Sequence, residues 1–521
     1  MSVGKLSRRD VLKSAAGVAT ITALGLKPYL VMAADDGVLK ARMVEDIQIL
    51  DPGYMIGGAE TTILYACMPR LAVPVLGSDG TWGWKPSDYV ESISMADDGI
   101  HIPFTLKQGF MWSNNLGEVT TDDVKYSFER MLKSDWSARW PTLDHVEVKD
   151  KYSGTIVLKK PFAGTFLMGA ASESGSIVPK AAVMKLKDEK FTTELPAQCG
   201  PYIMTSWTPK QSVVLKANPD WKGTKPDFAE IHLIDVEDTK AAELAFEAKE
   251  VAVAHIGLET AARYKKTPPA NSKVIELPGP LFTWLGMNTD NPKLKDIRIR
   301  KAIQRAVDTK SVIAGAYAGA APESHGVIPI GITGHRDKSG FSYNPDEAKA
   351  LLKEAGVSGL QLEIVALTGE PEQVAAAQVI QANLADVGID AKVKPTDSGP
   401  YWNLGLESKG DAWKTLELYI MRFRCSPDPA DAIQWFKKDQ VGVWNWERWS
   451  DPEFEDLWNK GLAELDPVKR NAIYVRMQDI MENTGAYVWI TFDPWDFASV
   501  TSLNPAFDSG GEYRVELFKK A

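Results

Sequence analysis

Two arginines and a cysteine, followed by a run of tryptophans, are the residues of this sequence best suited to chemistry. Arg422, Arg424 and Cys425 precede the segment 444–449, which reads Trp-Asn-Trp-Glu-Arg-Trp. If residues 422–425 form a strand, Arg422 and Arg424 share one face. Either guanidinium could then bind a carboxylate or phosphate group of a ligand. The alternative is that both arginines are solvated or held in structural ion pairs.

The tryptophan run allows two interpretations. An extended chain over 444–449 would place Trp444 and Trp446 on one face, and Asn445 and Trp449 on the other. Rigid aromatic walls with a few polar groups are typical of a small-molecule cleft. A tryptophan stripe also suits a hydrophobic core, so the pattern leaves both possibilities open.

Motifs for catalysis and cofactor binding are missing from the sequence. It contains no Gly-x-Ser-x-Gly elbow and neither of the glycine-rich phosphate-binding fingerprints. The six histidines are far apart, and none of them has the spacing of a zinc site. We therefore expect a binding protein with no catalytic residues, metal or cofactor. An exported hydrolase is the alternative from another functional class.

The N-terminal segment has the features of an export signal. Arg8 and Arg9 precede an apolar run over 15–26, and small residues follow at 31–34. This order predicts a cleaved signal of the twin-arginine type. The alternative, a membrane anchor, is disfavoured because the run is too short for about 30 Å of hydrocarbon. Cys67 is the first cysteine, so we expect a soluble periplasmic protein without a lipid anchor.

Bulk composition is that of a globular protein. The chain has 521 residues, of which 44% are hydrophobic and 25% charged, a size that suggests two or three domains. Its net charge of -10 comes without a basic stripe, which argues against nucleic acid as a partner. The three cysteines, Cys67, Cys199 and Cys425, could form one disulfide, but three buried thiols are the preferred interpretation.

Local patterns predict an α/β protein. A helix begins after Asn344, which caps it, and ends at Gly356. A strand over 360–364, a helix over 372–387 and a strand over 389–393 follow in turn. Strand, helix, strand is the βαβ order of an α/β domain.

Several segments, in order along the chain, resemble family 5 of the extracytoplasmic solute-binding proteins, which serve dipeptide, oligopeptide and nickel ABC importers. The strongest match is the strand and turn 104–113 (FTLKQGFMWS), followed by a capped helix at 120–128 (TTDDVKYSF). Residues 200–202, 218–221 and 296–303 are similar to later landmarks of the family. The segments 50–52, 343–356, 427–429 and 451–454 match in addition.

The resemblance implies an α/β fold of the type II periplasmic-binding-protein class, a two-lobed clamshell with an extra subdomain in the first lobe. The boundaries implied for this chain are a signal over 1–33, a first lobe over 34–280 with the inserted subdomain at about 77–195, a second lobe over 281–484 and a return to the first lobe over 485–521.

The resemblance also implies a ligand site between the lobes. In members that bind peptides, an aspartate a few residues before an Asp-Pro pair holds the ligand's ammonium group, and Cys425 takes that place before Asp428. A thiol lacks the carboxylate charge. The residues expected to bind ligand are Tyr54, Trp284, Tyr401, Trp402, Arg422, Arg424, Cys425, Trp444, Asn445, Trp446 and Trp495.

The implied function is that of the periplasmic component of an ABC importer. A peptide or peptide-like solute is the expected ligand, with an anionic sugar conjugate or an opine-like acid as the alternative. The expected partners are this ligand and a membrane permease with its ATPase, and the protein is expected to be a monomer. A metallophore or nickel ligand would need converging histidines or carboxylates that the sequence does not indicate.

Overall fold

The structure is a computed structural model that describes residues 37–521 apart from 56, 79 and 369. The expected signal over 1–33 lies outside the described residues, so it stays a prediction. Within the described part of the chain, no helix is both long enough and apolar enough to cross a membrane.

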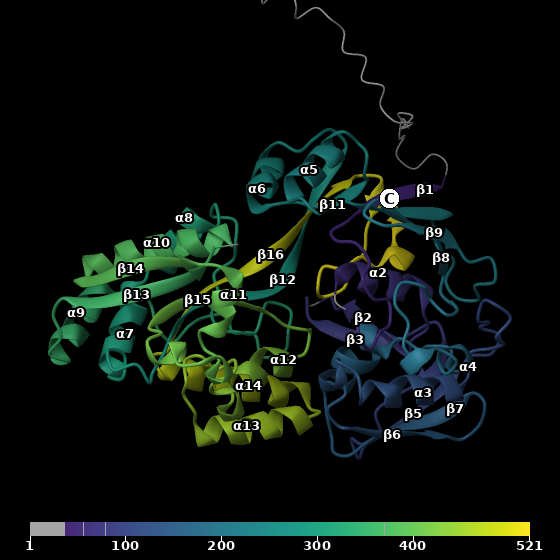
Figure 1. Cartoon of the computed structure of the whole chain (residues 1–521), viewed down its shortest axis with the longest axis horizontal. Helices are drawn as coiled ribbons and strands as arrows, with labels where there is room; N and C mark the ends of the chain where they lie inside the picture. Colours follow the sequence, from purple (N-terminus) through teal and green to yellow (C-terminus); the bar gives the residue numbers. More distant parts are fainter. Residues whose placement is uncertain (1–36, 56, 79, 369) are drawn as a thin grey trace, which may run out of the picture.

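A mixed ten-stranded sheet runs along the molecule and joins its two halves (Figure 1). In spatial order its strands are β14 (Ile389–Thr396), β13 (Leu360–Leu367), β15 (Leu418–Arg424), β12 (Ser272–Met287), β16 (Tyr487–Val500), β11 (Val253–His255), β1 (Val38–Met43), β10 (Glu230–Asp235), β9 (Ser212–Ala217) and β8 (Tyr202–Thr208). The pairs β13–β14 and β1–β10 are parallel, whereas the central pair β12–β16 is antiparallel.

The long strands β12 and β16 carry the chain from one half to the other. Their register shifts between Leu277 and Leu281, where residues 278–280 read Pro-Gly-Pro. Proline has no N–H to donate to the ladder. At Gly279 the backbone runs so close to the Asp493 carbonyl that a Cβ would overlap it. Two strands with an interrupted ladder form the kind of connection that permits hinge motion.

The first lobe combines the β1 end of the large sheet with a smaller four-stranded sheet. Between β1 and β8 it contains α2 (Gly58–Cys67), β2 (Ala72–Leu76), β3 (Trp82–Pro86), β4 (Val90–Ile93), β5 (His101–Leu106), α3 (Thr121–Met131), β6 (Leu143–Val148), β7 (Ser153–Leu158) and α4 (Lys180–Val183). The strand and the capped helix expected within 104–128 are present as β5 and α3. A capping box between Thr120 and Asp123 begins α3.

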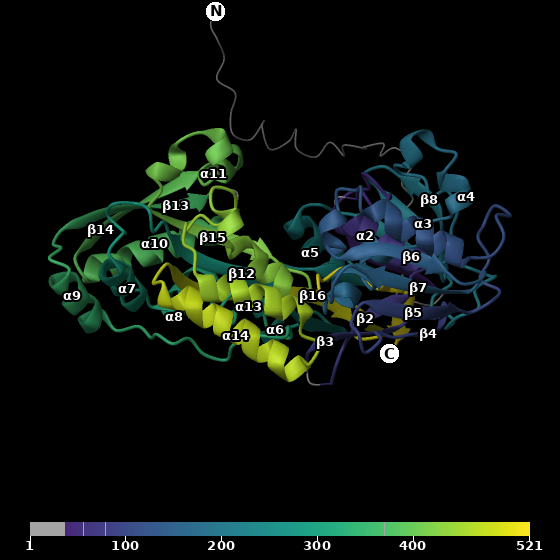
Figure 2. The ribbon, with the colours of Figure 1, turned by 90° about the horizontal axis from the view of Figure 1, so that it is seen from below.

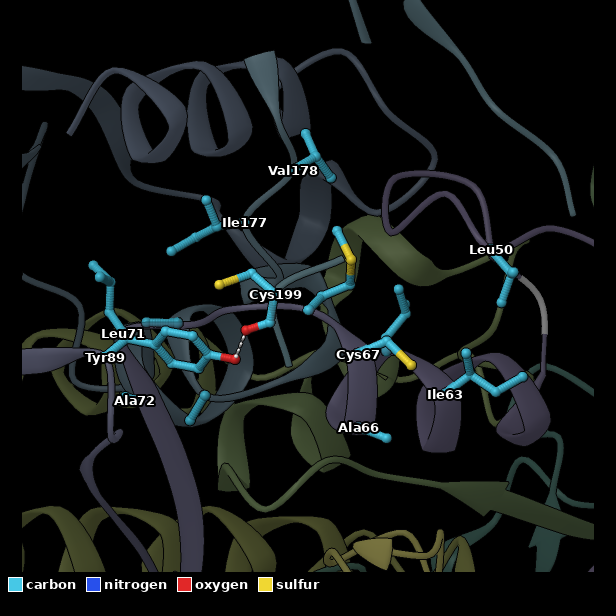
Figure 3. Close-up of a cluster of buried hydrophobic side chains, with 14 of the residues drawn as sticks. Leu50, Ile63, Ala66, Cys67, Leu71, Ala72, Tyr89, Ile177, Val178 and Cys199 are labelled. Atoms are coloured by element: carbon cyan, nitrogen blue, oxygen red, sulfur yellow. Dashed lines mark hydrogen bonds between the residues drawn. The ribbon is translucent and has the colours of Figure 1, made fainter. Parts of the chain in front are cut away.

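Two cysteines lie in the core of this lobe (Figure 3). Cys67 ends α2, and its carbonyl accepts a hydrogen bond from the Cys199 N–H at 3.0 Å. The carbonyl of Cys199 accepts another from the Tyr89 hydroxyl at 2.7 Å. All three cysteines of the chain are buried and free, which confirms the interpretation as thiols.

The second lobe has helices on both faces of its strands. They are α7 (Ile297–Ala306), α8 (Thr309–Ala316), α9 (Pro345–Glu354), α10 (Pro371–Asp386), α11 (Ser398–Asn403), α12 (Pro429–Ile433), α13 (Pro452–Ala463) and α14 (Pro467–Asn483). The Asn344 side chain caps α9, and Gly356 follows it with a φ of 71°. The predicted βαβ unit is confirmed as β13, α10 and β14.

Strand β16 shows how this lobe is layered. Val488 and Ile490 pack on the side of α7 to α10, whereas Tyr487 and Trp489 pack on the side of α12 to α14. The alternation follows from the two-residue period of a strand, and apolar residues on both faces specify a sheet covered on both sides. Short elements complete the fold: α5 (Thr239–Glu247) and α6 (Leu258–Lys266) beside β11, and the pair β17 (Leu503–Asn504) and β18 (Lys519–Lys520).

Candidate ligand-binding site

A cavity of about 720 Å³ lies between the two lobes. The first lobe supplies the end of β1, the start of α2, the helical turn Thr165–Ala170 and the loop 508–513. The second lobe supplies residues from 424 to 435. Figure 2 shows α2 of the first lobe and β15 of the second on opposite sides of the space between the lobes. The volume is in the range of small-molecule sites.

Aromatic rings form much of the cavity wall. They come from both lobes and comprise Tyr65, Trp136, Trp435, Trp495, Phe497 and Tyr513. Such rings provide flat apolar contact, and their faces also attract cations.

Two carboxylates meet the N-terminus of α2 at the cavity. Glu45 Oε1 accepts a hydrogen bond from the Gly58 N–H at 2.6 Å. A Cβ on Gly57 would overlap Glu45, and one on Gly58 would overlap Glu512, so the two glycines leave room for both acids. The partial positive charge of a helix N-terminus favours carboxylates there.

The loop 508–513 brings further acid to the same place. Asp508 accepts hydrogen bonds from the N–H groups of Gly510 and Glu512, at 2.8 and 2.9 Å. Arg424 donates to the Gly510 carbonyl at 2.7 Å and lies 3.5 Å from Glu512 Oε1. Burial raises the pKa of Glu512 to about 7, and the negative charges of Asp508 and Glu45 add to the rise.

A second charged group bridges the lobes. Arg139 of the first lobe lies 3.9 Å from Glu173 and 3.7 Å from Asp431 of the second lobe. Asp431 is held in place by the Ser426 N–H and by Gln434 Nε2, each at 2.6 Å. This carboxylate is therefore already surrounded by donors from the protein.

The other two basic residues of the cavity, Arg42 and His255, offer little positive charge to a solute. Arg42 donates to the backbone carbonyls of Val236, Glu237 and His255 at 2.8–2.9 Å. Burial lowers the pKa of His255 to about 4, so this imidazole is neutral at physiological pH.

The structure brings three of the predicted ligand-binding residues to the cavity: Arg424, Cys425 and Trp495. Arg424 ends β15, and its side chain is 47% exposed. Cys425 is buried, and its Sγ donates to the Pro280 carbonyl at 3.5 Å. Burial raises the pKa of this thiol well above its usual value, so it stays protonated.

Arg422 does not line the cavity. It forms ion pairs with Glu370 and, at 3.1 Å, with Asp493 of β16. Both arginines of β15 therefore have protein carboxylates beside them. The alternative of structural ion pairs describes this geometry better than a guanidinium that waits for an anionic ligand.

Four other predicted residues lie in the core of the second lobe instead. Trp284, Tyr401 and Trp446 are each about 1% exposed. Trp446 packs against Tyr401 and Tyr419. Asn445 is fully buried and donates to the carbonyls of Phe436, Lys437 and Trp449.

The physical reason is the local backbone. Residues 444–449 are not an extended strand, because Trp444, Trp446 and Glu447 lie in turns. Without the strict alternation of a strand, Trp446 and Trp449 can enter the same buried cluster. The core interpretation of the tryptophan run is the one the structure supports.

The last three predicted residues are half-buried and lie outside the cavity wall. The Tyr54 ring is 3.6 Å from Lys190 Nζ, a cation–π contact within the first lobe. Trp402 and Trp444 contact each other edge to face at 6.2 Å. They extend the aromatic core of the second lobe toward its surface.

The acids of the cavity, above all Glu45, Asp508 and Glu512, are not among the residues predicted from the sequence. Single acids in loops have no periodicity and no spacing that marks them. The available signal was the Ser-Gly-Gly turn between Asp508 and Glu512, because turn residues place their neighbours at a fixed separation. Among the described residues, no group of histidine, cysteine, aspartate or glutamate could hold a metal ion.

Comparisons with known proteins agree with this architecture. The chain is 26% identical over 458 residues to the probable D,D-dipeptide-binding periplasmic protein DdpA of Escherichia coli K12, covering 85% of this chain and 86% of the relative. It is 26% identical over 423 residues to the dipeptide-binding protein of the same organism, with coverages of 75% and 78%. The substrate-binding protein CtaP of Listeria monocytogenes superposes with a TM-score of 0.80 at 20% identity, covering 93% of this chain and 99% of that structure.

These similarities confirm the α/β fold of the periplasmic-binding-protein class that the resemblance implied. The similarity to the solved CtaP structure supports the fold only, because the sequence identity is low. Residues 87–441 match the bacterial extracellular solute-binding proteins, family 5 Middle, which is more than half of the chain. The chain therefore belongs to family 5 of the bacterial extracellular solute-binding proteins.

Proposed function

We propose that this protein is the periplasmic solute-binding component of an ABC importer and captures a peptide or peptide-like solute between its lobes. The observation that carries the proposal is the cavity lined by side chains of both lobes. The names of the two Escherichia coli relatives, both dipeptide-binding, favour a peptide over the sugar conjugate or opine-like acid.

The geometry suits capture followed by release. A solute between the lobes loses its water, so the walls must replace the lost hydrogen bonds and add apolar contact. The interrupted β12–β16 connection permits the lobes to rotate about it. A solute that contacts both lobes stabilises the closed arrangement, and a permease can recognise that arrangement.

Intrinsic fluorescence tests the proposal directly, because Trp136, Trp435 and Trp495 line the cavity. We expect saturable quenching by a mixture of small peptides, together with a smaller radius of gyration in solution scattering. Mass spectrometry should recover the bound peptide intact. Hydrolysis of the peptide during the assay would contradict the proposal and favour an exported hydrolase.

The proposal includes export by the twin-arginine route and a soluble mature protein that begins near residue 34. It also includes delivery of the solute to a membrane permease with its ATPase. Replacing Arg8 and Arg9 with lysine keeps the charge but removes the guanidinium pair. We expect the precursor of this variant to accumulate in the cytoplasm. Normal accumulation in the periplasm would contradict the export route and leave the binding function intact.

A further inference from the structure

The charges of the interlobe cavity are unbalanced. Among the described residues that line it, six are acids: Glu45, Asp135, Glu173, Asp431, Asp508 and Glu512. Three are arginines, namely Arg42, Arg139 and Arg424. The cavity therefore holds more acids than arginines, and the excess comes from the first lobe, because the second lobe supplies one acid, Asp431, and one arginine, Arg424.

The arginines do not offset this excess evenly. Arg42 donates its hydrogen bonds to three backbone carbonyls, and Arg139 lies between Glu173 and Asp431. Arg424 is left to face the loop 508–513 and gives its shortest hydrogen bond, 2.7 Å, to a carbonyl there. Of the carboxylates at the start of α2, Glu512 has only Arg424 beside it, at 3.5 Å, and Glu45 forms no ion pair in the part of the chain that the structure describes.

Two further groups in the wall have no internal partner. Ser426 Oγ and Trp495 Nε1 are both fully buried atoms, and neither finds a hydrogen bond within the described residues. Buried polar atoms of this kind are normally satisfied. The two residues line the cavity, one from each lobe.

We infer that the cavity selects a cationic solute, a peptide with a basic side chain, whose positive group lies among Glu45, Asp508 and Glu512. This inference rests on the proposed function and specifies the class of its ligand. An ammonium or guanidinium group there would compensate the acids, which are otherwise costly to desolvate. An anionic solute would add negative charge to a site that already has an excess of it.

The raised pKa of Glu512 agrees with this assignment. The groups that face this carboxyl are Arg424, Asp508, Glu45 and Tyr513. A carboxyl that is protonated near neutral pH in the empty cavity becomes ionised when a cation binds beside it. Glu512 is therefore the residue whose removal should change the charge preference most.

The test uses an equimolar mixture of Ala-X-Ala tripeptides, in which X is Lys, Arg, Gln, Leu, Asp or Glu. The protein is stripped of bound solute, incubated with the mixture and desalted, and the retained peptides are measured by mass spectrometry. We expect the Lys and Arg peptides to be enriched about tenfold or more over the Gln peptide, and the acidic peptides to be depleted.

Matched variants assign the preference to its residues. Glu512→Gln keeps the shape and removes the charge, so the enrichment of basic peptides should fall about tenfold. Glu45→Gln should also lower the enrichment of basic peptides, because it removes a second negative charge. The start of α2 should be kept, since the amide oxygen can still accept from the Gly58 N–H. Glu363→Gln is the control, since that acid lies in the second lobe outside the cavity and pairs with Lys394.

Each outcome decides something. Retention of neutral or acidic peptides in preference to basic ones would overturn the charge selection and leave peptide binding in place. An unchanged preference in both Glu512→Gln and Glu45→Gln would overturn the assignment of the cationic position. Retention of no peptide at all would overturn the proposed function and, with it, the inferred ligand class.

Discussion

Two regions of this molecule, the aromatic core of the second lobe and the interlobe cavity, are built from similar residues but differ in how their polar groups are used. Each contains tryptophans and a buried carboxyl whose pKa burial raises to about 7, Glu447 in the core and Glu512 at the cavity. Their surroundings separate them.

In the core, many polar groups are directed at each other, although Glu447 Oε2 and the Tyr419 hydroxyl have no partner among the described residues. Trp284 Nε1 donates to Glu447 Oε1 at 2.7 Å, and Thr289 donates to the Glu447 carbonyl from both its N–H and its hydroxyl at 2.9 Å. The Asn445 side-chain amide donates to three backbone carbonyls. These contacts fix the turns of residues 444–449.

At the cavity, residues of the same kinds line an open volume. Trp495 Nε1 and Ser426 Oγ lack partners within the described chain, and three acids converge at the start of α2. Buried polar atoms without a partner occur in both regions, so the comparison teaches that a cluster of aromatic and polar residues indicates a binding site only when it lines an open volume. The following predictions test this distinction.

Trp446→Ala should have the largest effect, on stability. The side chain is about 1% exposed and fills the space over Gly405, so its removal leaves a cavity in the core. We expect the free energy of unfolding to fall by about 3–5 kcal/mol, measured by urea denaturation. Affinity of the folded protein for its solute should not change.

The matched control for this prediction is Trp435→Ala, at the cavity wall. It should lower the free energy of unfolding by only about 1 kcal/mol and weaken solute binding. If the two variants had the same effects on stability and binding, the distinction between core and cavity wall would be wrong.

Glu447→Gln should raise stability at pH 8 by about 2–3 kcal/mol. The pKa of Glu447 rises from 4.5 to about 7 on folding, so the folded protein binds this proton more tightly than the unfolded chain. The stability that this proton provides is present at low pH and is lost as the pH rises from about 4.5 to 7. Glutamine stays neutral and avoids the loss, so the two proteins should converge near pH 5.

Unfolding curves at pH 5 and pH 8 measure this difference. Parallel pH profiles for the parent and Glu447→Gln would contradict the assignment of a buried, protonated carboxyl in the core.

Glu512 should control binding rather than stability. With a pKa of about 7 in the empty cavity, the Glu512 carboxyl is mostly protonated below pH 7, and only its ionised form attracts a cation. We expect the affinity for Ala-Lys-Ala to fall about tenfold between pH 8 and pH 6, which is about 1.4 kcal/mol. Fluorescence titration of the parent and of Glu512→Gln gives the comparison, and the variant should show a flatter profile. The same slope in both proteins would assign the titration to another group.

Reductant should have the smallest effect, since all three cysteines are free and buried. We expect the melting temperature with and without dithiothreitol to agree. A clear fall with reductant would reveal a disulfide and contradict the packing of Cys67 and Cys199 as separate thiols.

The sequence by itself determined the local elements and the family. The cap at Asn344, the left-handed Gly356 and the capping box at Thr120 act within a few residues, so their outcome depends little on the rest of the fold. The order of the matched segments along the chain identified the family, and with it the two-lobed fold.

Only the tertiary structure decided which residues meet. Arg424 and Glu512 are far apart in the chain and come together where the end of β15 meets the loop 508–513 at the cavity. The turns of 444–449 are set by long-range hydrogen bonds, such as the one from Thr289 to the Glu447 carbonyl, and these bury the tryptophans that a local pattern would place in a cleft. A sequence pattern reports spacing along one element, whereas a cavity is formed by the loops of several elements, whose positions depend on packing.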